Sequence, residues 1–302
     1  MKYCIKCVLP DTRPMAFIDS DGICSACKNH EVKNKINWKK KKIDFKKLVN
    51  LAKKRSSYYD CLIPVSGGKD STWQVITCLK YNLSPLTFTY KPVLRTKVGK
   101  ENIDNLKKLG VHHIEFTVNE NVEKKFIKKS FLKFGSMAVS MHMAMWNLAY
   151  NLASSFKIPY IFWGENSAVE YSGIKDKKFK YLNENWIKKY GNNFGTTAKD
   201  WIAKDLSQKD LAPFFKIKTK KDYIPKSIFL GDYFSWDPVN SFNISKKAGF
   251  KAEQSGPRTG IYNFADIDDN ILSIHHFIKL YKFGITRAHD NLSLEIRNNR
   301  LS

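Results

Sequence analysis

Residues 64–71 read Pro-Val-Ser-Gly-Gly-Lys-Asp-Ser, and these residue types at this spacing can bind a phosphate. The apolar run at 59–63 precedes them and a stretch with helical spacing follows, so a strand is expected to turn directly into a helix. At such a turn the backbone N–H groups converge, and the helix N-terminus adds partial positive charge. Gly67 and Gly68 let an anion come close to the backbone, whereas Asp70 suits a divalent cation between its carboxylate and a phosphate. The segment therefore predicts a site for a magnesium-bound phosphate or pyrophosphate.

This loop is not a Walker A motif, which needs G-x-x-x-x-G-K-[ST], because Ile63 holds the first glycine position and Asp70 follows Lys69. The segment resembles instead the PP-loop, S-G-G-x-D-S, of the ATP pyrophosphatases. The resemblance implies that ATP is split between its α- and β-phosphates and that an oxygen of the substrate is adenylylated. A glycine-rich turn without a ligand is the plainer alternative. The residues assigned to the nucleotide here are Pro64, Val65, Ser66, Gly67, Gly68, Lys69, Asp70 and Ser71, with Lys69 and Asp70 as catalytic residues.

Two C-x-x-C pairs lie near the N-terminus, Cys4 with Cys7 and Cys24 with Cys27, and sixteen residues separate them. This spacing is typical of zinc sites with four cysteine ligands. Four thiolates complete a tetrahedron without an open position, so a structural zinc is predicted. The segment is too short for a core of its own, and metal binding would supply its folding energy. Two disulfides or four unrelated thiols are the alternative, but no secretion signal indicates an oxidising compartment.

The composition fits a globular protein of one large or two small domains, with 302 residues of which 43% are hydrophobic. No run of about eighteen apolar residues is present, and residues 1–6 contain no apolar h-region of a secretory signal. A cytoplasmic protein without membrane insertion is therefore expected. The net charge is +24, from 52 Lys and Arg against 28 Asp and Glu. This excess suggests a polyanionic partner, but the Lys and Asn codon bias of an AT-rich genome explains it equally well.

Strands and helices alternate along the middle of the chain. Strands are expected at 59–63, 86–90, 114–118 and 159–163, and helices at 99–110 and, with a break near Gly135, at 121–157. This order predicts an α/β fold in which helices cover both faces of a parallel sheet. Short helical pieces such as 198–206 interrupt the region 171–225. Helical spacing returns at 226–302, with helices expected from Asp237 to about Gly249 and from Asp268 to Phe283.

Four parts are expected along the chain: a zinc ribbon at 1–30, a basic connecting helix at 31–57, a PP-loop nucleotide-binding domain at 58–170, and an insertion or lid with a helical substrate-binding region at 171–302. The lysines at 39–55 alternate with an apolar stripe and should form the solvated face of the connecting helix. Ligands of parallel sheets bind at the carboxyl ends of the strands. The glycine loop is therefore expected to meet Thr89, Tyr90, Gly164 and Glu165, with Thr89, Tyr90 and Gly164 on the nucleotide. Glu165 would be a catalytic carboxylate that holds Mg²⁺ together with Asp70, unless it is only a surface or capping residue.

Several segments together resemble the N-acetyl sugar amidotransferases of bacterial surface-polysaccharide (lipopolysaccharide, O-antigen) synthesis: the cysteine pairs, residues 60–71, Trp163-Gly164-Glu165-Asn166, and residues 282–290. The resemblance covers nearly the whole chain. It implies that ATP activates the oxygen of an acetamido group on a nonulosonate or uronic-acid sugar, and that ammonia displaces this oxygen to leave an acetamidino group. The implied cofactors are ATP, Mg²⁺ and Zn²⁺. The ammonia would come from a separate glutaminase subunit, with a cyclase-like subunit as a further partner.

The sugar itself is assigned to Asn166, His275, Arg287 and Asp290. Arginine suits bidentate recognition of a carboxylate, so Arg287 and Asp290 are expected to clamp a sugar carboxylate and hydroxyl, unless they form only a structural ion pair. His275 and His276 are adjacent on a predicted helix and face different directions, so one of them is expected to reach the site, unless both serve packing or the surface.

The sequence departs from this family in two places. Tyr171-Ser172-Gly173-Ile174 stands where the family has a Tyr-Gly-Gly run, so this loop is expected to differ. The chain stops at Ser302, where family members continue into further helices, which predicts a short member or a truncated chain.

Two other functions compete with the sugar amidotransferase. A tRNA-modifying enzyme of the thiolation type fits the basic charge and the zinc module, but sulfur transfer normally needs a catalytic cysteine pair or an iron–sulfur site in the core domain. Cys61 and Cys78 are predicted to be buried and do not form a C-x-x-C. A zinc-ribbon module that binds nucleic acid without catalysis is the third possibility. Nucleic acid is therefore not the expected partner.

Overall fold

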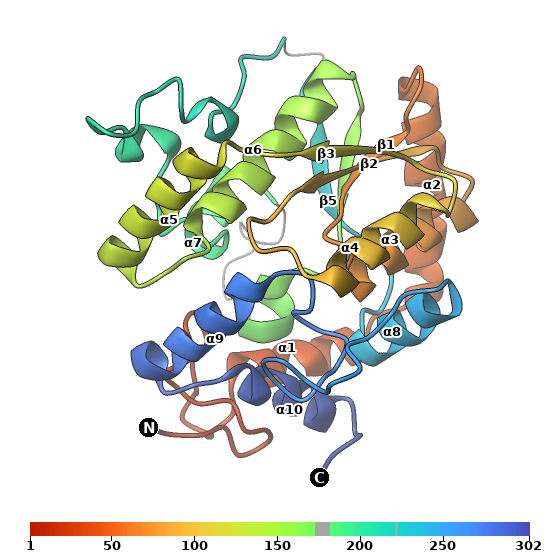
Figure 1. The fold of residues 1–302 in the computed structure, drawn as a ribbon. Helices are drawn as coiled ribbons and strands as arrows, with labels where there is room; N and C mark the ends of the chain where they lie inside the picture. Colours follow the sequence, from red (N-terminus) through yellow and green to blue (C-terminus); the bar gives the residue numbers. More distant parts are fainter. Residues whose placement is uncertain (173–181, 221–222) are drawn as a thin grey trace.

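The computed structural model describes residues 1–172, 182–220 and 223–302 (Figure 1). Its centre is a parallel sheet with the strand order β3-β2-β1-β4-β5. The strands are β1 (Cys61–Pro64), β2 (Pro85–Tyr90), β3 (His112–Phe116), β4 (Tyr160–Trp163) and β5 (Lys226–Phe229). The chain moves outward from β1 to β3 and returns to β4 on the other side of β1. The strand order therefore reverses between β1 and β4, where open α/β sheets bind their ligands.

Helices cover both faces of this sheet, as the sequence predicted. One face carries α2 (Trp38–Arg55), α3 (Lys69–Lys80) and α4 (Lys97–Lys107), and the other carries α5 (Glu120–Phe134) and α6 (Val139–Ser155). Successive residues of a strand point to opposite faces. Leu62 accordingly packs into the core on the α6 side, whereas Cys61 and Ile63 pack into the core on the α3 side. A strand buried on both faces reads as one continuous apolar run, which is why β1 and β4 were predictable.

The basic helix α2 packs against the sheet despite its high charge, because it carries an apolar stripe. Phe45, Val49 and Ala52 are buried in the core against the sheet, while most of the lysines between them are exposed. Asn37 caps the helix by accepting a hydrogen bond from the N–H of Lys40. The prediction of a solvated lysine face is confirmed.

The N-terminal and C-terminal segments lie together on one side of the sheet domain. Figure 1 shows both chain ends there, among α1 (Ser25–Asn34), α8 (Pro238–Lys247), α9 (Asn270–Phe283) and α10 (Arg287–Arg297). Asp237 and Asp269 cap α8 and α9 through their carboxylates. The predicted helical C-terminal region is therefore confirmed, with α9 beginning two residues later than expected. No helix among the described residues is both long and apolar enough to cross a membrane.

The strand β5 corrects the prediction, because helical spacing was expected throughout 226–302. Its four residues pair with β4 at the edge of the sheet, Lys226 beside Tyr160 and Phe229 beside Trp163. A segment this short, with a charged first residue, shows no alternation of apolar and polar residues that would predict a strand. It becomes a strand because it pairs with β4. The region before it holds short elements: the π-helix η1 (Ala168–Ser172), α7 (Glu184–Tyr190), and the 3₁₀ turns η3 (Ala198–Trp201) and η4 (Ala212–Phe214), while η6 (Leu230–Asp232) follows β5.

Candidate active site

A cavity of about 900 Å³ opens at the carboxyl ends of β1, β2 and β4, at the reversal of strand order. Its walls come from the glycine loop after β1 (residues 64–71), from α6, α7, α9 and α10, and from the loop between the two cysteine pairs. The predicted convergence of strand ends thus forms one wall. Segments from both ends of the chain form the opposite wall, and a cavity of this size is typical of a small-molecule site.

The glycine loop has the tight backbone that its sequence predicted. Gly67 has a φ of +86°, and a Cβ there would lie 3.0 Å from the carbonyl oxygen of Gly99. Only glycine satisfies both conditions without strain. Gly68 is the N-cap of α3, and its carbonyl accepts from the hydroxyls of Ser71 and Thr72 at 2.9 and 3.0 Å. The residues of the loop that line the cavity are Pro64, Val65, Ser66, Asp70 and Ser71.

Asp70 is held in place by two donors on its two carboxylate oxygens. The ammonium of Lys69 donates to Oδ2 at 2.6 Å, and the indole N–H of Trp236 donates to Oδ1 at 2.9 Å. Lys69 is only 8% exposed and is not among the cavity-lining residues, because its side chain turns back toward Asp70 and the ring of Phe264. The two predicted catalytic residues of the loop are therefore in contact, with Asp70 at the cavity surface and Lys69 behind it.

Two further carboxylates, Glu165 and Asp268, line the cavity near Asp70. Burial, together with the negative charge of Asp70, raises the pKa of Glu165 to about 7. Burial also raises the pKa of Asp268 to about 6, and its carboxyl group interacts with the side chain of Ser66. For both carboxyl groups, burial outweighs the interactions that lower the pKa. Carboxylate oxygens in such surroundings fit Mg²⁺, which binds through one or two carboxylates plus substrate phosphates.

At the α9–α10 side of the cavity, two arginines hold the carboxylate of Asp290. Arg13 Nε donates to Asp290 Oδ1 at 2.8 Å, and Arg287 Nη1 lies 3.5 Å from Oδ2. Arg287 also pairs with Asp266 at 3.1 Å. Burial raises the pKa of Asp290, but the charges of Arg13, Arg287 and Lys279 outweigh burial and hold it well below its usual range. The predicted pair of Arg287 and Asp290 is thus brought together at the cavity as part of an ion-pair network.

Tyr171 stands between the acidic and the basic side of the cavity. The guanidinium carbons of Arg13 and Arg287 lie 5.6 and 5.4 Å from the centre of its ring. Burial holds its pKa well above the ordinary value, with Glu165 and Arg287 among the charges that act on it. The hydroxyl therefore stays protonated and can donate a hydrogen bond. Tyr171 lies in η1, and such π-helical turns occur frequently at functional sites. Of the predicted variant loop, Gly173 and Ile174 lie outside the described residues.

The remaining predicted residues divide into those at the cavity and those beside it. Tyr90, Gly164 and His275 line the cavity, and the Tyr90 hydroxyl donates to Glu123. The other two are buried and lie outside the lining: the Thr89 hydroxyl donates to the carbonyl of Val65, and the Asn166 carbonyl oxygen accepts from Trp186. In His276, the second histidine of the pair, Nε2 lies 3.5 Å from Asp266.

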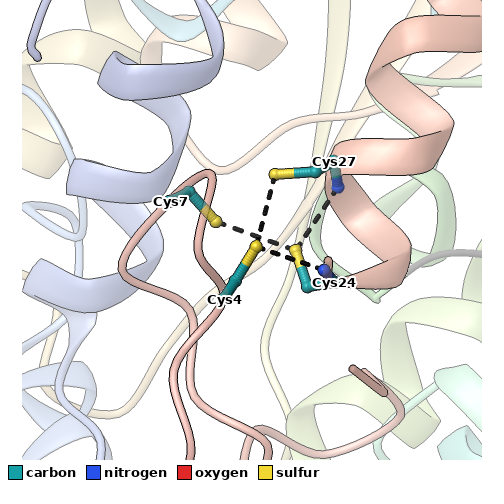
Figure 2. Close-up of side chains that lie close together, drawn as sticks. All are labelled: Cys4, Cys7, Cys24 and Cys27. Atoms are coloured by element: carbon teal, nitrogen blue, oxygen red, sulfur yellow. Dashed lines mark hydrogen bonds between the residues drawn. The ribbon is translucent and has the colours of Figure 1, made fainter. Parts of the chain in front are cut away.

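The four cysteines of the two C-x-x-C pairs form one buried cluster (Figure 2). All four sulfur atoms lie within 4.8 Å of one another, with Cys4 and Cys27 at 3.9 Å and Cys7 and Cys24 at 3.7 Å. A tetrahedral zinc with Zn–S bonds of about 2.3 Å places its sulfurs about 3.8 Å apart, so the arrangement fits that metal. The cysteines are not joined in disulfides. The clustering of the four cysteines is confirmed, and zinc remains a proposal.

The cysteine module is attached to the active-site elements. The Ser25 hydroxyl donates to the Ser172 carbonyl in η1, and Lys33 of α1 pairs with Glu170 at 2.8 Å and donates to the Trp236 carbonyl at 2.6 Å. The loop between the two cysteine pairs also carries Arg13 into the cavity wall. The module therefore positions η1 and Trp236 as well as its own arginine.

Sequence reasoning missed three residues that line this cavity, Arg13, Asp268 and Lys279, and Trp236, which donates to Asp70 from outside the lining. Trp236 directly precedes a predicted helix, and Asp268 was expected only to begin one. Arg13 and Lys279 had no motif around them. Nothing in a single sequence indicates that a loop between cysteines reaches a cavity some 270 residues away along the chain, because that contact exists only after folding.

No protein-family model and no curated protein matches this chain. Solved structures with a partly similar fold include a predicted subunit of tRNA methyltransferase from Methanocaldococcus jannaschii, with 14% identity, a TM-score of 0.35, and coverage of 78% of this chain and 91% of that one. An ammonia-dependent NAD synthetase from Campylobacter jejuni has 15% identity, a TM-score of 0.35, and coverage of 72% and 99%. An NMN synthetase from Francisella tularensis has 11% identity, a TM-score of 0.33, and coverage of 70% and 96%. At these identities and scores the likenesses do not bear on what the chain binds or does.

Proposed function

We propose that this protein is an ATP-dependent amidotransferase that forms AMP and pyrophosphate and converts the N-acetyl group of a surface sugar into an acetamidino group. The observation that carries the proposal is the glycine loop opening α3 at the strand-order reversal, with Asp70 and Glu165 lining the same cavity. The motif of residues 64–71, which resembles the PP-loop, supplies the nucleotide class.

The reaction asks the site to do two things. An amide oxygen is a poor leaving group, so its attack on the α-phosphorus of ATP, with loss of pyrophosphate, turns it into a good one. Ammonia then adds to the activated carbon, and AMP leaves with the former amide oxygen and a proton is released. The N–H groups at the start of α3 stabilise the phosphates as negative charge develops.

Asp70 and Glu165 would hold Mg²⁺, which supplies charge neutralisation on the phosphates when bound. Lys69 and Trp236 orient the carboxylate of Asp70 through the bonds at 2.6 and 2.9 Å. The Tyr171 hydroxyl lies between this side and the arginines, where the sugar would occupy the rest of the cavity.

The nitrogen source is proposed to be ammonia from a separate glutaminase subunit, with a cyclase-like subunit as a further partner. All six cysteines of the chain are described, and each is buried: four form the cluster, and Cys61 and Cys78 are both 0% exposed in the sheet core. A glutaminase nucleophile needs an accessible thiolate. The same burial disfavours the tRNA-thiolation alternative.

The fate of the amide oxygen tests this function. The chain is incubated with Mg-ATP, ammonium chloride and a sugar carrying oxygen-18 in its acetyl carbonyl, and AMP is analysed by mass spectrometry. Appearance of the label in AMP, with pyrophosphate as co-product, is expected. Formation of ADP and phosphate, or of unlabelled AMP alone, would contradict the proposal. Asp70→Asn is expected to lower turnover roughly a hundredfold, whereas Asp104→Asn, on the exposed side of α4, serves as the matched control and keeps full activity.

A further inference from the structure

Lys279 of α9 is a cation of the cavity wall without a bonding partner. Its side chain lines the cavity, and among the described residues no hydrogen bond or ion pair joins its ammonium to the protein. Burial lowers its pKa to about 8, and Asp290, Arg287, Arg13 and Asp266 are the charges that act on it. Arg13 and Arg287, by contrast, pair with Asp290 and Asp266, so the ammonium of Lys279 keeps its N–H donors for a ligand.

The charges at this side of the cavity do not balance. Among the described residues, the cations here are Arg13, Arg287, Lys279 and Lys282, and the carboxylates paired with the arginines are Asp266 and Asp290. Positive charge is therefore in excess, and Lys279 and Lys282 both line the cavity. A cation removed from water costs free energy unless it is paired, so this side of the cavity favours a ligand that carries negative charge.

We propose that Lys279 is the specificity residue for the acidic group of the sugar, binding its carboxylate directly, with Arg13 and Arg287 beside it in the cavity wall. This deepens the proposed function and rests on it for the identity of the ligand as a sugar. A carboxylate supplies both a negative charge and acceptor oxygens for the free ammonium.

The assignment also changes the role expected of Arg287 and Asp290. Asp290 is 3% exposed, and Arg13 and Arg287 lie at its two carboxylate oxygens. Its main contacts are therefore with the two arginines, which also lie 5.6 and 5.4 Å from the centre of the Tyr171 ring. The pair therefore shapes the subsite, and the free ammonium of Lys279 makes the contact that discriminates.

Binding of a matched pair of ligands tests this subsite. The probes are N-acetylneuraminic acid and its methyl ester, which share a shape and differ in the charge of the carboxyl group. Both are titrated calorimetrically into the full chain with Mg²⁺ and α,β-methylene-ATP. A charge-assisted hydrogen bond is worth roughly a tenfold to hundredfold change in affinity, so the acid should bind at least tenfold more tightly than the ester. Lys279→Met should abolish this difference, and Lys279→Arg should keep it.

Lys282→Met is the control, because Lys282 lies one turn further along α9 and also lines the cavity, but donates to the Phe134 carbonyl. The control should keep the preference for the acid. Equal binding of acid and ester by the wild-type chain overturns the proposal, as does a preference that survives in Lys279→Met with its circular dichroism unchanged. If Lys279→Met weakens the binding of UDP-N-acetylglucosamine but not of N-acetylneuraminic acid, the carboxylate assignment is overturned. The titration measures binding and needs no turnover. Failure to form labelled AMP would therefore refute the proposed chemistry but would leave the outcome of the binding test unchanged.

Discussion

Removal of Arg13 should destabilise the protein more than removal of any surface cation, because it leaves a buried carboxylate short of a partner. The Arg13–Asp290 pair spans 2.8 Å, with side chains 15% and 3% exposed. In the absence of Arg13, Asp290 still has Arg287 at 3.5 Å, so the carboxylate loses only part of its stabilisation by cations. A hydrogen bond to a charged group contributes about 1.5–3 kcal/mol, and we expect Arg13→Ala to lower the free energy of unfolding by an amount in that range.

A double-mutant cycle isolates the pair. Arg13→Ala, Asp290→Asn and the double variant are unfolded in urea with zinc at one concentration, because a ligand of the native state shifts apparent stability. The control cycle uses Lys107 and Asp104, an exposed pair on α4 at 3.0 Å, for which a coupling of roughly 0.3–0.5 kcal/mol is expected. A coupling for Arg13–Asp290 no larger than that of the control would refute the idea that this ion pair anchors the loop between the cysteine pairs at the active site.

The same pair predicts a pH dependence of stability. The folded pKa of Asp290 lies below its unfolded value of about 4. Its contribution is therefore fully present above about pH 4 and is lost as the pH falls through and below that value. Arg13→Ala should weaken this acid dependence, which is measured as the midpoint of urea unfolding between pH 6 and pH 2. An equally steep loss in the variant would contradict the cause assigned to the shift.

Three further results are expected. Cys4→Ser should lower bound zinc, measured by mass spectrometry of the native protein, from one ion to a substoichiometric amount; unchanged zinc content would exclude the cluster as its site. Trp236→Phe should raise KM for Mg-ATP and lower kcat/KM roughly tenfold to a hundredfold through loss of a donor to Asp70, and no change would mean that this bond does not position the carboxylate. Glu165 has a raised folded pKa of about 7, so stability in the free protein should fall as the pH rises from about 4 to 7; Glu165→Gln should flatten that slope, and an unaltered slope would assign it to another group.

The local elements of this protein follow from its sequence. The apolar run of β1, the two glycines after it and the helical spacing of α3 are neighbours in the chain, and their geometry depends on φ preferences and backbone hydrogen bonds over a few residues. The cysteine pairs likewise predict their own cluster, because each C-x-x-C turn brings two thiolates together and the four need each other. The apolar stripe of α2 likewise predicted which face of that helix is buried, because its spacing is also local in the sequence.

The tertiary structure decides which of these residues form one site. Lys69 and Asp70 are adjacent in sequence, yet packing against Phe264 and Trp236 places one behind the other and leaves only Asp70 at the cavity. Strand β5 exists only because β4 offers an edge to pair with. Arg13 meets Asp290 through a contact between distant parts of the chain, and this pairing depends on burial and charge that no local pattern encodes.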